Sequence, residues 1–171
     1  TSTGSIVVDS SLTGLTYNLY LLAGNTLTVN NAISTTLPNV SLYLGSVGAM
    51  TIGANITAVG SINLGYYPTT AFYPSSITLN ADVSAGIYGS GNVSIYYTAG
   101  TFTQNGNITA NNGVGSVSIY PDALNAGSVG ASASFIRTSG TITAANVYVY
   151  SAFNTYMTDL TLGDATHTGM N

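Results

Sequence analysis

The 171-residue sequence has very few charged side chains. It contains no lysine, glutamate, cysteine or tryptophan, and only 4% of its residues are charged, against about a quarter in an average soluble domain. The charged residues are Arg137, Asp9, Asp82, Asp122, Asp159 and Asp164. Nucleic-acid binding through phosphate contacts needs several lysines or arginines. The composition therefore excludes that class of protein.

Two further absences limit the function. Without cysteine the chain has no disulfide scaffold, thiolate metal site or cysteine nucleophile. Its longest apolar run, residues 19–23, is far shorter than the roughly 20 residues that cross a bilayer, so we predict no membrane span. A chain that begins at Thr1 fits removal of a secretory signal. We therefore expect an extracellular, cell-surface protein.

Residue types suited to catalysis are sparse. The single histidine, His167, lies near Asp159 and Asp164, but the three do not have the spacing of zinc or calcium ligands. The sequence contains no nucleophile elbow and no phosphate-binding loop. We expect no enzyme activity, no catalytic or metal-binding residue and no cofactor.

The chain is rich in small polar residues, with 25 Thr, 20 Ser, 17 Asn and 20 Gly, and it repeats. The first block of the repeat occurs at Thr26–Ser34, Ala49–Thr57, Ser76–Ser84 and Thr101–Thr109, with weaker copies at Thr141–Val149 and Asp159–His167. The second block occurs at Asn39–Tyr43, Ser61–Gly65, Asn92–Tyr96, Ser116–Tyr120 and Asn146–Tyr150. Within each block apolar residues alternate with polar ones, which predicts β-strands.

The alternation assigns one set of side chains to the core. In the first blocks these are Leu27, Val29, Met50, Ile52, Ile77, Leu79, Phe102, Gln104, Ile142 and Ala144. In the second blocks they are Val40, Leu42, Ile62, Leu64, Val93, Ile95, Val117, Ile119, Val147 and Val149. The steps Asn105-Gly106, Asn112-Gly113 and Ala126-Gly127 are expected to form turns with positive φ.

Aligned copies of this kind favour a β-solenoid, in which like residues stack on like. At Gly106-Asn-Ile-Thr-Ala110 and Gly140-Thr-Ile-Thr-Ala144 the chain resembles the filamentous-haemagglutinin type of β-helix repeat. We predict an all-β, solenoid-like stack of short strands over residues 24–171. A β-sandwich completed by a neighbour's strand is the alternative.

The composition also resembles thread-type extracellular filament subunits of acidophilic archaea. That resemblance implies that an N-terminal strand completes the neighbouring subunit and that asparagines carry glycans. We expect residues 1–23 to stand outside the repeat, as a cap or a donated strand. The subunit joint is predicted at Ser5, Ile6, Val7 and Val8.

Two residue sets are candidate surface features. Four Asn-x-Ser/Thr sequons are candidate N-glycan sites, at Asn39, Asn55, Asn92 and Asn107; the abundance of these residue types is the alternative explanation. A tyrosine ends most second blocks, so a ladder is predicted at Tyr43, Tyr96, Tyr120 and Tyr150, with Tyr66 just off register. The ladder serves either to stabilise the sheet or to contact another subunit.

Threonine pairs give a third candidate surface. They occur at Thr26/Thr28, Thr101/Thr103 and Thr141/Thr143, with single threonines at Thr51, Thr78 and Thr161. Such ladders suit ice binding, but Ala49, Ser76 and Asp159 interrupt them, and threonine is also a common strand residue.

Taken together, the sequence predicts a structural subunit of an extracellular filament. The subunit would polymerise with itself, head to tail, and carry N-linked glycans. The lack of charge supports this, because charged residues normally keep strand edges apart. An adhesin module that binds glycans or surfaces is the alternative, and an ice-binding protein is the third possibility.

Overall fold

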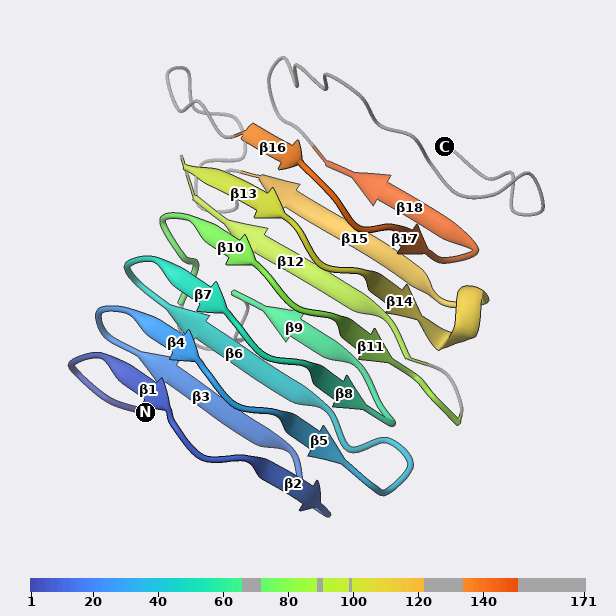
Figure 1. Ribbon diagram of the computed structural model, residues 1–171, viewed down its shortest axis with the longest axis horizontal. Coiled ribbons are helices and arrows are strands. Elements are labelled where there is room, and N and C mark those ends of the chain that lie inside the picture. Colours follow the sequence, from blue (N-terminus) through green and yellow to red (C-terminus); the bar gives the residue numbers. More distant parts are fainter. Residues whose placement is uncertain (66–71, 89–90, 99, 122–133, 151–171) are drawn as a thin grey trace.

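The computed structural model describes residues 1–65, 72–88, 91–98, 100–121 and 134–150. In this part the chain winds into six coils, and each coil contributes one short strand to each of three sheets. The coils are stacked in chain order (Figure 1). All neighbouring strands are parallel and pair with their equivalents one coil away. The prediction of a β-solenoid-like stack is confirmed, and the β-sandwich alternative is wrong.

The three sheets each contain six strands in stacking order. The first sheet contains β1 (Ile6–Val8), β4 (Leu27–Val29), β7 (Met50–Ile52), β10 (Ile77–Leu79), β13 (Thr101–Gln104) and β16 (Ser134–Arg137). The second contains β2 (Leu12–Leu15), β5 (Ile33–Thr35), β8 (Ile56–Ala58), β11 (Val83–Ala85), β14 (Ile108–Ala110) and β17 (Ile142–Thr143). The third contains β3 (Leu19–Ala23), β6 (Leu42–Ser46), β9 (Ile62–Leu64), β12 (Val93–Tyr97), β15 (Ser116–Pro121) and β18 (Asn146–Val149).

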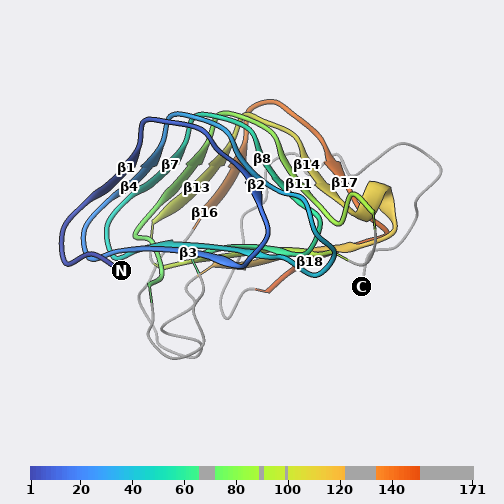
Figure 2. The same cartoon turned by 90° about the horizontal axis from the view of Figure 1, so that it is seen from below.

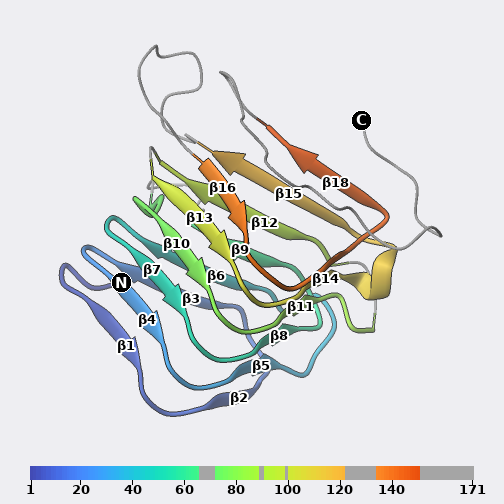
Figure 3. The same ribbon diagram turned by 45° about the horizontal axis from the view of Figure 1, so that its top comes forward.

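The third sheet forms the base of the stack and the other two sheets form its remaining sides (Figure 2). A short 3-10 turn, η1 (Asn111–Gly113), follows β14. Figure 3 shows the first sheet running from β1 to β16 along one side of the stack. Because every coil repeats the same path, equivalent residues form columns along the stack.

Inward columns of apolar side chains fill the core. In the first sheet one such column contains Ile6, Leu27, Met50, Ile77, Phe102 and Phe135. The inward residues predicted for the four strong copies of the repeat are all buried. Like stacks on like, as the rings of Phe102 and Phe135 show with centroids 4.9 Å apart. Four polar side chains, Thr35, Ser41, Ser46 and Gln104, are also buried. The Nε2 of Gln104 donates to the carbonyl oxygen of Gly106 at 2.9 Å.

Residues 1–23 belong to the stack, contrary to the expectation that they stand outside it. Strand β1 pairs with β4 in register, and Val8 lies in the core. The amide of Ile6 donates to the carbonyl oxygen of Thr26 at 2.9 Å. The first coil does not show the repeat pattern, because Ile6-Val-Val-Asp9 has valine and aspartate where most later copies have threonine and asparagine. The solenoid therefore begins at residue 6 and not at residue 24.

Two blocks lie in a register different from the one predicted. In the third sheet Leu42, and not Val40, pairs with Ile62, so this copy is displaced by two residues. A shift of two residues keeps the same side chains facing the core, so alternation does not reveal it. The block beginning at Thr141 also differs, because its strand β17 pairs with β14 in the second sheet and not with a strand of the first.

The predicted turns divide into two kinds. Asn112 and Gly113 adopt φ values of 50° and 93°, as expected for the second Asn-Gly step. Gly106 does not adopt positive φ. It is required for a close approach instead, because a Cβ atom there would lie 2.1 Å from the carbonyl oxygen of Ala81 in the preceding coil. The step at Ala126-Gly127 lies outside the described residues.

Candidate functional site: the open coil ends and the aromatic face

The apolar core is incompletely covered at both ends of the stack. The inward residues of the middle coils are fully buried, since coils cover them on both sides. In the end coils of the described stack Val8, Phe135 and Ile142 are buried. Other inward residues there are only partly buried: Ile6, Leu12, Leu15, Leu19 and Leu21 at one end, and Ala144, Val147 and Val149 at the other. Covering apolar surface of this kind is favourable by roughly 25 cal/mol per Å². Each end therefore offers an apolar surface for association.

The outermost strands also present backbone edges. Within the described residues, β1 and β2 lie at one edge of their sheets and β16 and β17 at the other. In the third sheet Ser2 forms a bridge with Ala23 and covers the end of the outer edge of β3. Exposed edges pair readily with further strands unless charges block them.

Three of the predicted joint residues, Ile6, Val7 and Val8, form β1 at the edge of the first sheet, and Ser5 directly precedes it. Val8 points into the core, while Val7 points outwards and is 53% exposed. The hydroxyl of Thr26 donates to the Ser5 Oγ at 2.9 Å, so this segment is hydrogen-bonded to its own second coil. The segment is thus placed for contact with a neighbour through its outer edge, while its inner edge pairs within the chain.

Tyrosines stack on the outer surface of the third sheet, in two groups. Tyr96, Tyr120 and Tyr150 form one column, with ring centroids 4.3 Å and 4.5 Å apart and interplanar angles of 1°. Tyr43 is not in this column. Because its strand is displaced by two residues, Tyr43 lies two residues before the column position and pairs with Tyr20. The ring centroids of Tyr43 and Tyr20 are 4.6 Å apart. The prediction of a single four-membered ladder is therefore wrong.

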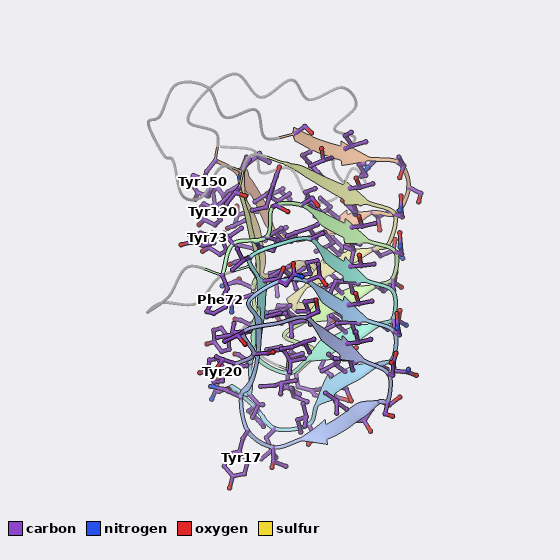
Figure 4. The ribbon with its side chains drawn as sticks, turned by 90° about the vertical axis from the view of Figure 1, so that its left-hand side faces the viewer. Tyr17, Tyr20, Phe72, Tyr73, Tyr120 and Tyr150 are labelled. Atoms are coloured by element: carbon purple, nitrogen blue, oxygen red, sulfur yellow. The ribbon has the colours of Figure 1, made fainter. Side chains whose placement is uncertain are left out.

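A segment after β9 fills the space between the two groups. The tyrosine column has glycine at Gly45 and Gly65, and a Cβ at Gly45 would lie 2.8 Å from the Cβ of Phe72. Tyr73 then lies 6.0 Å from Tyr96. Figure 4 shows the labelled aromatic residues along one side of the stack. The two glycines were the available sequence signal for this covering segment, whereas Tyr66 lies outside the described residues.

The stacking limits what this aromatic face can bind. Parallel rings within 5 Å cover one another's faces, so the tyrosine edges and hydroxyls are what neighbours meet. Burial, and then the adjacent phenol of Tyr20, raise the pKa of Tyr43. Desolvation, and then the neighbouring Tyr120, raise the pKa of Tyr150. The face thus presents a row of ring edges and phenol hydroxyls, which suits hydrogen bonding more than ring stacking on a sugar.

All four predicted glycan sites are exposed, and three of them have a structural role. The Oδ1 atoms of Asn55, Asn92 and Asn107 accept backbone N–H groups of the next coil at 3.1, 2.8 and 3.0 Å. Asn39 differs, because it lies in a loop with a φ of 63°. The sequon pattern therefore coincides with a corner motif in which asparagine precedes an inward aliphatic residue. Glycosylation itself stays a prediction.

Threonines form a column on the outer face of the first sheet. Its inner members are Thr28, Thr51, Thr78 and Thr103. The pair Thr141/Thr143 belongs elsewhere, since Thr143 aligns with Thr109 in the second sheet. Asp159 and Thr161 lie outside the described residues. Ice binding by these columns stays a prediction.

Nothing in the described part of the chain groups three or more potential metal ligands. His167, Asp159 and Asp164 lie outside the described residues. Over the same described ranges, no helix has the length and apolar character needed to cross a membrane. No family model, curated protein or solved structure matches the chain.

Proposed function

We propose that the protein is a structural subunit of an extracellular filament and that it polymerises by stacking its solenoid coils end to end. The observation that carries the proposal is the apolar core left partly open at both ends of the stack. Within the described residues the first and last coils belong to the same three sheets, so a second copy stacked on them would continue these sheets in the same direction.

The energetic argument favours self-association over a different partner. Stacking covers the half-buried apolar residues of both end coils and pairs their backbone edges in one step. A different partner would have to supply three parallel strands at matching positions. A second copy of this chain has them already.

The low charge supports the same function. Natural proteins commonly protect strand edges with lysine and other charged residues. This chain has no lysine, and its net charge of −4 comes from five aspartates and one arginine. The exposed sequons and the aromatic face fit a surface role, in glycan attachment and in side-to-side contact between filaments. The alternative, an adhesin module, requires a ligand-binding surface on a chain that remains monomeric.

Electron microscopy of the purified protein, at neutral and at acidic pH, tests the proposal. We expect filaments of uniform width at both pH values, because few groups titrate in this range. Dispersed particles at both pH values would contradict the proposal and make glycan binding and ice binding the next assays.

A matched pair of lysine variants locates the contact. Val7→Lys places a charge on the open edge, whereas Thr51→Lys places it in the same column within the stack. Val7→Lys should abolish or shorten the filaments, and Thr51→Lys should leave them intact. Equal effects of the two substitutions would contradict assembly through the coil ends.

A further inference from the structure

We infer that β16 of one copy pairs with β1 of the next copy, in the same register that relates successive coils within the chain. This inference rests on the proposed function and names the partner surface in detail. Under this register Phe135 lies beside Ile6, Ile136 beside Val7 and Arg137 beside Val8 of the next copy. No strand is exchanged, because β1 remains paired with β4 of its own chain.

The outer column of the first sheet supports this register. Within the described residues its four inner members are threonines, and its two outermost members are branched apolar residues. Val7 is 53% exposed and Ile136 is 47% exposed. In the inferred joint these two side chains lie on adjacent strands and pack against each other. The apolar residues thus occur at the two places where this column would meet another copy.

Arg137 lies on β16 and aligns with the buried Gln104 in an inward column, so the inferred register places it beside Val8 of the next copy. Asp9 follows Val8 by one residue, is exposed and accepts a hydrogen bond from Asn30 Nδ2 at 2.8 Å. The two charged side chains therefore face opposite sides of the sheet and do not pair across this joint.

Other ways of joining two copies do not continue the columns of the first sheet. Joining two first coils would place two copies of β1 antiparallel to each other, which breaks the continuous parallel sheet. Shifting the register by one residue would turn Ile136 toward the core side of the next copy. The inferred register continues the inward and the outer columns together.

Cysteine cross-linking tests the register, since the natural chain contains no cysteine. Adjacent strands lie about 4.8 Å apart, which is within the Cα separation of about 4.4–6.8 Å that disulfides accept. Assembled Val7→Cys/Ile136→Cys should therefore give a ladder of covalent oligomers on a non-reducing gel after mild oxidation. The control, Val7→Cys/Thr103→Cys, places the second thiol one coil deeper, about 9.6 Å away, and should give none.

A third variant distinguishes stacking from strand donation. In Val7→Cys/Thr28→Cys the two thiols face each other within one chain, so oxidation should give a cross-linked monomer. A ladder from this variant would show that β1 pairs with a neighbour's β4 and would overturn the inference. Filaments without a ladder from Val7→Cys/Ile136→Cys would also overturn it and leave the proposed function standing. Absence of filaments in the natural protein would overturn both.

Discussion

Alanine substitutions at Leu42 and Leu19 probe the same inward column at two depths of the stack. Leu42 lies in β6, between coils on both sides, and is fully buried. Burial of this kind makes Leu→Ala cost about 2–5 kcal/mol, since the neighbours close the cavity only in part. A cost near 3 kcal/mol lowers the Tm by roughly 6–12 °C in a chain of this size. Leu42→Ala should show this loss in thermal unfolding followed by circular dichroism.

Leu19 pairs with Leu42 from the outermost coil and is only partly buried. Its replacement leaves a site open on one side, so we expect a loss of below about 2 kcal/mol in the free energy of unfolding. The larger effect should appear in assembly. If the joint buries the missing carbons, losing about 1–2 kcal/mol raises the critical concentration roughly 5- to 30-fold.

The two assays together decide the outcome. Pelleting at a series of protein concentrations gives the critical concentration, and unfolding below that concentration gives the stability of the single subunit. Leu42→Ala, where folded, should assemble near the natural concentration. The reasoning is refuted if Leu19→Ala destabilises the subunit as much as Leu42→Ala does, or if it leaves the critical concentration unchanged.

Three further predictions concern single residues. Burial raises the pKa of Tyr97. The free energy of unfolding should therefore stay constant up to about pH 10 and fall above it, as this tyrosine ionises in the unfolded chain. Urea titrations across this pH range should show a shallower fall for Tyr97→Phe than for the natural protein. Gly106→Ala should cost about 1–3 kcal/mol through its close backbone contact, whereas Gly4→Ala, with space around it, should be nearly neutral by the same titration. Asn107→Ala removes a hydrogen-bond acceptor between coils and should lower the Tm. Asn39→Gly should leave the Tm within about 2 °C, because glycine tolerates the positive φ at that position. Equal losses of stability within the glycine pair or within the asparagine pair would contradict the role given to Gly106 or to Asn107.

Much of the fold was predictable because a solenoid repeats its own sequence. The alternation around Met50 and Ile52, or Ile77 and Leu79, identifies inward residues without reference to any other part of the chain. Stacking like on like then follows from the alignment of the copies. The sequence therefore predicts which side chains of each strand point into the core and which point outwards.

The register between coils was harder to predict. The two-residue displacement of Leu42 is invisible to a period of two, and it moved Tyr43 out of the predicted ladder. The first coil was missed because Val7 stands where later copies have threonine. The covering segment at Phe72 and Tyr73 comes from a long connection, whose path depends on contacts and not on periodicity. These features depend on tertiary packing, which short motifs do not encode.

The axial rise per subunit in the filament is the most direct test of end-to-end stacking. The six described coils at about 4.8 Å each account for about 29 Å of the rise, with the strands perpendicular to the filament axis. Helical reconstruction from electron micrographs should find a rise of at least about 29 Å, together with a strand repeat of about 4.8 Å along the axis. Filaments whose strands run along the axis, or a protein that remains monomeric at high concentration, would contradict the account.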